Sequence, residues 1–210
     1  MVCGPLLQGM PVLFANKTGK LFPESHYIKQ AGLMSNMFRT RSVVPQDKAK
    51  ILSLYRRVAR KAGGIARSET ELTPDYIQHC MDQAKLTGLE LVVDHPDNPD
   101  EIIAEIHGYK LEPKMFAHVI TELTIAVDPD FHGIGVGKLI FTDFLNHVTD
   151  HRPDVLRVEL MTQESNVRAR NLYKSMGFVA EGRFANRIRM YNNELDADIP
   201  MVWFNNNFIP

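Results

Sequence analysis

The sequence predicts a mixed α/β domain of about 170 residues, without an internal repeat. Segments in which apolar residues recur every three or four positions alternate with segments in which they recur every second position, as expected for helices and strands. Along the chain these segments follow the order β-α-α-β-β-β-α-β-α-β-β. Because 44% of the 210 residues are apolar, the chain has enough hydrophobic side chains for one packed core.

The first strand and the first helix are predicted at the start of this domain. Residues Met37–Val44 form a strand-like run that Pro45 stops, and Asp47 then opens a helix that Gly63-Gly64 ends. The basic stretch Arg56–Lys61 is expected to be the solvated face of this helix, and a role in holding an adenosine or an acidic partner stays open. Four apolar residues define the buried face of the helix: Ile51, Leu54, Tyr55 and Val58.

A second helix and a hairpin are predicted next. The helix begins at Thr73-Pro74, an N-cap residue followed by the residue favoured at the first helical position, and it runs to Gly88. The strand-like runs Leu89–Val93 and Glu101–Leu111 then flank the turn-rich sequence DHPDNPD. This arrangement predicts two strands joined in a hairpin.

The run Val119–Val127 is predicted to be a strand because its side chains follow a two-residue alternation. A strand points successive side chains to opposite faces of its sheet. The alternation therefore places Thr121, Leu123, Ile125 and Val127 on one face and Glu122, Thr124 and Ala126 on the other.

The last third of the domain is predicted to contain two helices and three strands. Val155–Met161 is a strand, Asn166–Met176 is a helix, and Gly177 stands where a left-handed helix cap is wanted. Two final strands are expected near Phe178 and over Met201–Phe204. The other helix precedes Val155 and has its apolar positions at Ile140, Phe141, Phe144, Leu145 and Val148.

Charge and composition argue against several classes of function. Twenty-four Lys and Arg against 25 Asp and Glu give a net charge of -1, whereas nucleic-acid-binding proteins usually show a basic excess. No run approaches 18 apolar residues, so no spanning helix is predicted, and Pro5 and Pro11 interrupt a start that lacks a basic region, which argues against a signal peptide. Cys3 and Cys80 are too few for a disulfide framework. We therefore expect a cytoplasmic protein that binds neither nucleic acid nor membrane.

A glycine-rich loop follows the strand that ends at Val127. In His132-Gly133-Ile134-Gly135-Val136-Gly137-Lys138, three glycines alternate with other residues just before a helix. Glycine lets backbone amides approach a ligand, and amides at a helix N-terminus favour a phosphate. The spacing fits neither a Walker loop, which needs Ser or Thr at Leu139, nor a dinucleotide fingerprint, which needs glycine at Lys138. The structural alternative is a turn that only permits tight packing of strand and helix.

Two blocks of sequence together resemble the GNAT N-acetyltransferase superfamily. His132-x-x-Gly135-x-Gly137 is similar to its Q/R-x-x-G-x-G/A acyl-CoA signature, and Asn166–Phe178 is similar to its N-x-x-A-x-x-L-Y-x-x-x-G-F motif. The resemblance covers about residues 38 to 206 and implies a GNAT-like acyl-CoA N-acyltransferase fold, with a central mixed, mostly antiparallel sheet flanked by helices. The chain then divides into an extension of unknown role, residues 1–36, and an N-acetyltransferase domain, residues 37–210.

The resemblance also implies acetyl-CoA as cosubstrate and points to the residues that bind it. The backbone of the strand before the loop is expected to pair with the pantetheine arm, and the amides of the loop are expected to bind the pyrophosphate. Because a histidine replaces the usual Gln or Arg, the backbone of the loop matters more than this side chain. Asn166 is expected to contact the cofactor, and it is also a plain helix N-cap. The expected cofactor-binding residues are Ile125, Ala126, Val127, His132, Gly133, Gly135, Val136, Gly137, Lys138 and Asn166.

Acetyl transfer to an amine requires a base for the amine proton and an acid for the departing thiolate. Tyr173 is the candidate acid, because the resembling family places a tyrosine of this motif near the CoA sulfur; a core tyrosine is the alternative. Glu122 is the candidate base, because the other residues on its strand face are small. Glu159 is the weaker candidate, and a solvent-facing carboxylate is the structural alternative for Glu122. No serine or cysteine stands in a nucleophile signature, so transfer is expected to be direct.

The acceptor is expected to be a primary amine on a small molecule or at a protein N-terminus. The family implies an acceptor site around Tyr55–Glu71 and Arg183–Pro200, where Glu194, Asp196 and Asp198 could attract a cation. His147 and His151 invite a zinc interpretation, but no third ligand is apparent beside them, so no metal is expected. A homodimer is a further possibility.

Two other functions stay open at this point. One is a non-catalytic domain of the same fold that binds acyl-CoA as a sensor or scaffold. The other is a nucleotide- or phosphosugar-binding α/β protein, which would leave the block Asn166–Phe178 unexplained.

Overall fold

The computed structural model describes residues 13–15, 21–23, 38–61, 65–190 and 192–210. The chain divides into two units, Met1–Met37 and Phe38–Pro210. In the first unit, β1 (Leu13–Ala15) pairs antiparallel with β2 (Leu21–Pro23), a pair of strands that the sequence does not predict. The rest of the predicted extension lies outside the described residues.

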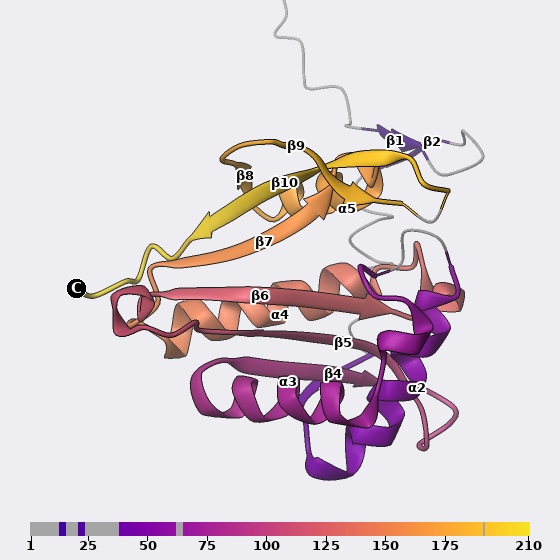
Figure 1. Cartoon of the computed structure of the whole chain (residues 1–210). Helices are drawn as coiled ribbons and strands as arrows, with labels where there is room; N and C mark the ends of the chain where they lie inside the picture. The colour runs from indigo at the N-terminus through magenta and orange to yellow at the C-terminus, as the bar shows by residue number, and fades with distance from the viewer. Residues whose placement is uncertain (1–12, 16–20, 24–37, 62–64, 191) are drawn as a thin grey trace, which may run out of the picture. The chain divides into compact units, whose positions relative to one another are not determined.

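An eight-stranded sheet forms the second unit, in the order β3-β4-β5-β6-β7-β10-β8, with β9 paired to β10 (Figure 1). Only β6 and β7 run parallel, and every other neighbouring pair is antiparallel. The predicted mixed, mostly antiparallel sheet is therefore confirmed. Its strands are β3 (Thr40–Ser42), β4 (Leu89–Asp94), β5 (Ile102–Tyr109), β6 (Val119–Val127), β7 (Arg157–Gln163), β8 (Val179–Ala180), β9 (Phe184–Arg189) and β10 (Leu195–Phe204).

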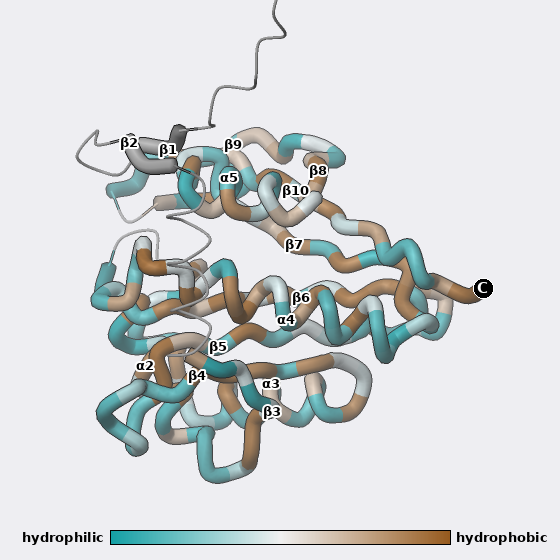
Figure 2. Tube along the Cα trace, turned by 180° about the vertical axis from the view of Figure 1, so that it is seen from behind, coloured by the Kyte–Doolittle hydropathy of each residue, from teal (hydrophilic) through white to brown (hydrophobic). Residues whose placement is uncertain are grey.

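Helices cover both faces of this sheet. On one face, α2 and α3 pack against Val92, Ile102 and Ala126 in the main hydrophobic core. On the other face, Phe144 of α4 lies against Gly108 of β5. Figure 2 shows β4 and β5 largely in hydrophobic colours and the helices in mixed ones, as amphipathic helices over buried strands require. The helices are α2 (Lys48–Ala59), α3 (Pro74–Thr87), α4 (Val136–His151) and α5 (Val167–Ser175), with short 3₁₀ turns at Pro45–Asp47, Glu69–Glu71, Lys114–Phe116 and Pro129–Phe131.

Two predicted helix starts are confirmed by capping contacts. The Thr73 side chain accepts a hydrogen bond from the Tyr76 amide at the start of α3, and the Asn166 side chain accepts one from the Ala169 amide at the start of α5. Gly177 has a φ of 92°, the left-handed conformation that its position after α5 predicts.

The structure corrects two predicted boundaries and adds one strand. Helix α2 ends at Ala59, before the predicted stop at Gly63-Gly64, which lies outside the described residues. The sequence misses β9, because its residues are almost all exposed and polar side chains interrupt its apolar alternation. Strand β10 begins at Leu195 rather than near Met201.

Strand β6 contains a β-bulge at Glu122, whose φ of 49° lies in the left-handed region. Tyr109 of β5 pairs with Thr121, and His107 pairs with Thr124, so β6 has one extra residue over this stretch. Because His107 and Tyr109 share a face of β5, Thr124 and Thr121 share that face as well. The predicted alternation, which puts Thr121 and Thr124 on opposite faces, is wrong here because the extra residue shifts the two-residue period.

Strands β6 and β7 diverge after a short contact (Figure 1). Their parallel pairing is limited to Val119 with Arg157 and Ile120 with Val158. Strand β6 nevertheless continues to Val127, and β7 continues to Gln163. The sheet is therefore split into two halves over the second part of these strands.

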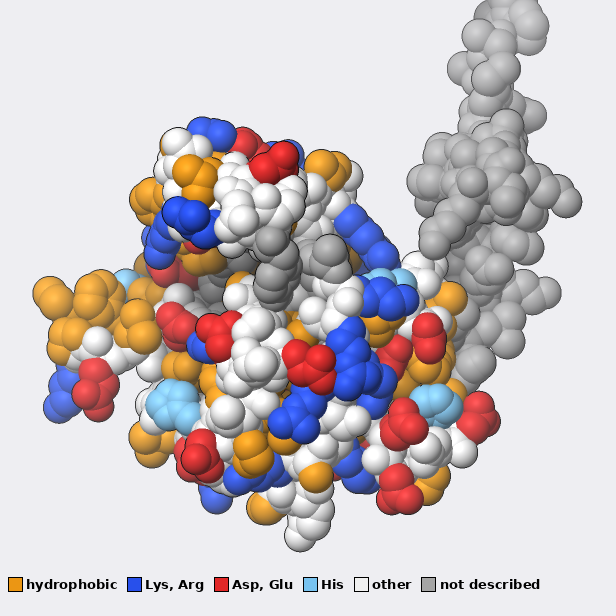
Figure 3. Space-filling model, turned by 45° about the vertical axis from the view of Figure 1, so that its right-hand side comes forward, with side chains coloured by type: hydrophobic (Ala, Val, Ile, Leu, Met, Phe, Trp, Pro, Cys, Tyr) orange, Lys and Arg blue, Asp and Glu red, His pale blue; other side chains and the backbone are white. Residues whose placement is uncertain are grey.

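The visible surface mixes charges of both signs. Figure 3 shows basic side chains beside acidic ones across this face, in keeping with the net charge of -1. Among the described helices, none combines the length and the apolar character needed to cross a bilayer.

Candidate active site

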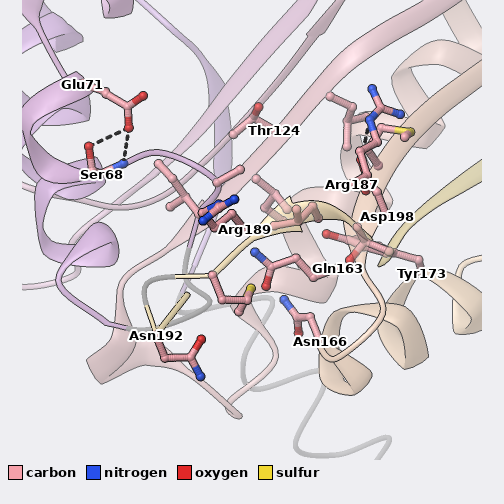
Figure 4. Close-up of a pocket in the computed structure, with 18 residues that line it drawn as sticks. Ser68, Glu71, Thr124, Gln163, Asn166, Tyr173, Arg187, Arg189, Asn192 and Asp198 are labelled. Carbon is pink, nitrogen blue, oxygen red and sulfur yellow. Dashed lines mark hydrogen bonds and ion pairs between the residues drawn. The ribbon is translucent and has the colours of Figure 1, made fainter. Parts of the chain in front are cut away.

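Two adjoining cavities open where β6 and β7 diverge. The larger has a volume of about 710 Å³ and lies between residues of β6, β7, α5, β9 and β10; we call it the central cavity. Figure 4 shows the polar side chains around it, which come from both halves of the sheet. These polar lining residues are Ser68, Glu71, Thr124, Thr162, Gln163, Asn166, Tyr173, Arg187, Arg189, Asn192 and Asp198.

The smaller cavity, of about 390 Å³, lies on the face of the sheet that α2 and α3 cover; we call it the helix-side cavity. It shares six lining residues with the central cavity, among them Leu123, Thr124 and Met161. The two spaces therefore meet at the diverging strands. The polar residues that line the helix-side cavity are Arg67, Glu71, Tyr76, His107, Tyr109, Thr121, Glu122 and Thr124.

The backbone of Ile125 faces the gap between the strands. The Asp128 amide donates to the Ile103 carbonyl of β5 at 2.8 Å, and alternate residues of an antiparallel strand bond to the same neighbour. Ala126 and Thr124 therefore direct their backbone groups to β5, while Ile125 and Val127 direct theirs to the other side, where β7 has moved away. Ile125 also lines the central cavity, so its amide and carbonyl are available to an extended ligand there.

The glycine loop begins α4 with strained backbone that only glycine adopts easily. Gly133 and Gly135 have φ values of 81° and 99°, and Gly135 is the N-cap of α4. The first bond of the helix runs from the Leu139 amide to the Gly135 carbonyl at 2.9 Å, so the amides of the first turn have no acceptor within the helix. A Cβ built on Gly135 meets no atom within 4 Å, which leaves open space for a ligand.

Close packing of the helix on the strand explains why another residue of the loop, Gly137, is a glycine. A Cβ on Gly137 would lie 3.4 Å from Val127 Cγ2, so this residue lets α4 sit close to the end of β6. The packing explanation therefore applies to Gly137, whereas Gly135 borders open space. The loop lines neither cavity; it follows the end of β6.

The His132 side chain holds the loop in place. Its Nε2 donates to the Val127 carbonyl at 2.9 Å, and its Nδ1 accepts from Arg168 of α5 at 3.2 Å. Both ring nitrogens are therefore engaged within the protein. This geometry agrees with the expectation that the loop binds through its backbone rather than through this side chain.

The basic stretch Arg56–Lys61 is largely solvated, as expected, because Arg56, Arg60 and Lys61 are exposed; Arg57 is half-buried and supports the same region. Arg57 donates to the buried Asp128 carboxylate at 2.6 Å and to the Ile102 carbonyl at 2.9 Å. Arg60 pairs with Glu69 at 2.8 Å. Within this solvated stretch, Arg57 therefore fixes the turn between β6 and the glycine loop.

Tyr173 is a core tyrosine that also faces the central cavity. Its ring packs 5.6 Å from Phe141 and 6.1 Å from Phe178 between ring centroids, and it also lines the central cavity. Burial raises the pKa of its hydroxyl to about 12, so this group keeps its proton at neutral pH. Asn166 lines the same cavity while capping α5, and the structure therefore brings Ile125, Asn166 and Tyr173 together.

Glu122 lies apart from that group, on the helix-side cavity. Glu122 is exposed at the bulge of β6. It lies near Tyr109, whose own burial is the main reason that its pKa is raised to about 12, and the charge of Glu122 adds to this rise. Glu159 pairs with Arg157 at 2.7 Å and lines neither cavity. Of the two carboxylates that the sequence proposes as base, only Glu122 therefore faces a cavity.

The sequence analysis missed a buried polar cluster beside the helix-side cavity. The Glu105 carboxylate accepts from the Tyr55 hydroxyl at 2.5 Å and from His107 Nδ1 at 2.9 Å. Burial and the charge of Glu105 raise the pKa of Glu90 to about 9, so Glu90 carries a proton at neutral pH. Burial is the largest single effect on the pKa of His107 and lowers it, but the charge of Glu105 and the hydrogen bonds to Cys80 and Glu105 together outweigh it, so the net pKa is above its usual value.

The same cluster is the set of residues best placed to hold a metal ion. Ligand atoms of Glu90, Glu105 and His107 lie within 4.8 Å of one another, and Oε2 of Glu90 has no hydrogen-bond partner. In contrast, His147 and His151 lie 4.8 Å apart between ring centroids, and no third ligand joins them among the described residues. The sequence does carry one signal for the cluster of Glu90, Glu105 and His107: these ionisable residues lie on one face of two otherwise apolar strands.

The comparisons with known proteins bear on the whole domain. The sequence matches the profile of the Acetyltransferase (GNAT) family over residues 52–178, more than half of the chain. Comparison with curated proteins gives no match. Solved structures of similar fold include an acetyltransferase of the GNAT family from Streptococcus pneumoniae, with a TM-score of 0.70 and 17% identity over 80% of this chain and 99% of that chain.

Two further solved structures agree with it. A GNAT superfamily phosphinothricin acetyltransferase from Sinorhizobium meliloti, in complex with AcCoA, has a TM-score of 0.71 and 15% identity over 83% of this chain and 93% of that chain. An N-acetyltransferase from Staphylococcus aureus Mu50 has a TM-score of 0.68 and 13% identity over 80% and 98%. The profile match and this shared fold show that the chain belongs to the acetyltransferase (GNAT) family, whose members are acetyl-CoA-dependent N-acetyltransferases.

Proposed function

We propose that the chain, through residues 37–210, transfers the acetyl group of acetyl-CoA directly to a primary amine on a small molecule or at a protein N-terminus. The observation that carries this proposal is the gap between β6 and β7. There the backbone of Ile125 faces a cavity, and β6 leads into a glycine loop whose amides begin α4. A pantetheine arm and a pyrophosphate need these two features in this order.

The cofactor contacts in this proposal come mostly from the backbone. The amides from Gly133 to Lys138 bind the pyrophosphate, helped by the dipole of α4. The outward-facing backbone of Ile125 pairs with the pantetheine arm, and Ala126 and Val127 form the strand that presents it. Asn166 contacts the cofactor from the start of α5.

Glu122 and Tyr173 divide the proton transfers of the reaction. The thioester supplies a carbonyl carbon that the amine nitrogen attacks and a thiolate that leaves. Glu122 accepts, directly or through water, the proton that the amine must lose. Tyr173 donates its proton to the departing thiolate, which its raised pKa permits because the hydroxyl is protonated at neutral pH. Among the described residues the one cysteine, Cys80, is buried and lines neither cavity, which supports direct transfer without an acyl-enzyme.

A substitution in the glycine loop tests the cofactor assignment. Gly135→Glu should abolish acetyl-CoA binding in titration calorimetry, because the residue has a φ of 99° and the added carboxylate would repel the pyrophosphate. Gly182→Glu is the matched control, since a Cβ there makes only an ordinary contact of 3.6 Å with Pro200 Cγ. Unchanged binding in Gly135→Glu, with both variants folded, would contradict the assignment.

Catalysis is tested by the release of free thiol from acetyl-CoA with a panel of amines. Turnover with at least one primary amine is the expected result. Tight binding of acetyl-CoA without thiol release from any amine would point instead to an acyl-CoA-binding sensor or scaffold.

A further inference from the structure

We propose that the acceptor carries an anionic group, such as a carboxylate, in addition to its amine, and that Arg67 binds this anion in the helix-side cavity. The inference rests on the proposed function and narrows the class of its acceptor to small molecules of the amino-acid type. Three observations support it: the setting of Arg67, its lack of a carboxylate partner, and the charges across the cavity.

The first observation is that Arg67 is held in a defined orientation at the cavity wall. Its guanidinium carbon lies 4.1 Å from the centroid of the Tyr76 ring, at the start of α3. Stacking on a ring occupies the flat face of a guanidinium and leaves its N–H donors free at the edge. An arginine oriented in this way is prepared for two parallel hydrogen bonds to a carboxylate.

The second observation is that Arg67 has no carboxylate partner in the described part of the chain. Other arginines of the described residues form close ion pairs: Arg57 with Asp128 at 2.6 Å and Arg183 with Glu164 at 2.6 Å. Glu71 lines the same cavity, but its carboxylate accepts from the Ser68 amide at 2.8 Å and from the Ser68 hydroxyl at 2.6 Å (Figure 4). Arg67 therefore feels the charge of Glu71, but no carboxylate among the described residues forms an ion pair with it.

The third observation is the distribution of charge across the helix-side cavity. Arg67 supplies a positive charge to the lining of this cavity, and Glu122 supplies an exposed carboxylate. The other carboxylate of the lining, Glu71, is already engaged by Ser68. A simple amine or a polyamine would leave Arg67 without an anion. An acceptor with one amine and one carboxylate satisfies both signs, with its nitrogen towards Glu122. The volume of about 390 Å³ suits an acceptor of amino-acid size.

Matched acceptors test this inference in the full-length protein. We expect thiol release to be faster with an α-amino acid than with the amine that lacks only its carboxylate, by about 10- to 100-fold in kcat/KM. The probes are the common amino acids, each compared with its decarboxylated amine. The same assay reports the KM for acetyl-CoA, which separates acceptor binding from cofactor binding.

Variants of Arg67 assign the discrimination to this residue. Arg67→Gln should raise the KM for the amino acid by about 10- to 100-fold, leave its kcat and the KM for acetyl-CoA nearly unchanged, and leave the decarboxylated amine unaffected. Arg67→Lys keeps the charge but loses the paired donors, so it should recover part of the loss. Arg60→Gln is the matched control, because Arg60 is exposed, pairs with Glu69 and lines neither cavity.

The outcomes separate this inference from the proposed function. If decarboxylated amines react as well as amino acids, or if Arg67→Gln affects both alike, the inference is wrong while the acetyltransferase proposal stands. A protein N-terminus as the preferred acceptor would also overturn it, since that amine has no carboxylate beside it. If no amine releases thiol, the proposed function fails and the inference fails with it.

Discussion

At the scale of single residues, the surroundings of the two catalytic candidates fit opposite roles. Tyr173 lies among aromatic rings, and burial raises its pKa to about 12, so its hydroxyl remains a proton donor at neutral pH. Glu122 is an exposed carboxyl group at a bulge, beside the cavity that we assign to the acceptor. Groups in such different environments can act as acid and base at the same pH.

Replacing the candidate base should slow the reaction in a pH-dependent way. Glu122→Gln is expected to lower kcat by about 10²- to 10⁴-fold near pH 7, because no carboxylate then accepts the amine proton. The loss should shrink at higher pH, where more of the acceptor is already unprotonated. Thiol release measured across a pH series checks both parts.

Glu159→Gln is the control for this experiment, since Glu159 pairs with Arg157 outside both cavities and should change kcat little. The reverse pattern, a large loss in Glu159→Gln and none in Glu122→Gln, would assign the base to Glu159.

The motifs predicted which residues meet but not all of their neighbours. Ile125, Asn166 and Tyr173, far apart in sequence, do line one cavity, because each belongs to a segment whose place the family resemblance implied. The cluster of Glu90, Glu105 and His107 was not predicted, because strand pairing brings it together and no motif records that pairing. Arg67 was likewise hidden, since its orientation depends on the ring of Tyr76.

At the scale of elements, periodicity and capping predicted the helices, and exposure limited the prediction of strands. Thr73 and Asn166 cap their helices as expected, because a side-chain cap is a local contact. Strand β9 was missed because it is exposed and is held mainly by its pairing with β10. The bulge at Glu122 was missed because a positive φ at a glutamate has no sequence signal.

The junction between α3 and β4 depends on one glycine. A Cβ on Gly88 would lie 1.9 Å from the Gly108 carbonyl oxygen, so the two strands would have to move apart. Gly88→Ala should therefore lower the free energy of unfolding by about 3 kcal/mol, at the upper end of the range for overpacking. Urea unfolding gives this value directly.

Gly182→Ala serves as the control, because its Cβ would meet Pro200 Cγ at an ordinary 3.6 Å. A change of less than about 1 kcal/mol is expected there. Equal stability of the two variants would show that the strands at Gly88 separate more easily than the structure indicates.

At the scale of the whole molecule, a buried set of ionisable groups joins α2, β4 and β5. Tyr55, Glu90, Glu105 and His107 come from these three elements and are almost inaccessible to solvent. Their protonation therefore depends on the folded state, and the stability of the fold depends on pH.

Glu90 sets the direction of this dependence. Its pKa is about 9 in the folded protein and near 4.5 in the unfolded chain, so the folded protein binds the extra proton between these pH values. The resulting stabilisation is fully present below about pH 4.5 and is lost as pH rises to about 9, by up to about 1.4 kcal/mol per pH unit. Glu90→Gln should flatten this fall, as measured by urea unfolding at several pH values between 5 and 6.5, because above this range His107, whose pKa is also raised, adds a fall of its own.

Glu112→Gln, at an exposed position, should keep the slope of the unmodified protein. A slope that survives in Glu90→Gln would contradict the assignment to Glu90. A stoichiometric metal ion in the purified protein would show instead that the cluster holds a cation.

The divergence of β6 and β7 has a mechanical consequence. Only two residue pairs join the halves of the sheet along these strands, and behind them the rings of Phe141, Tyr173 and Phe178 bridge α4 and the second half. The two halves of the sheet are thus connected over a short stretch, and the ring of Tyr173 lies beside this connection. A ligand in the central cavity would contact β6 and β7 together and so restrict the movement of one half against the other, close to the ring of Tyr173.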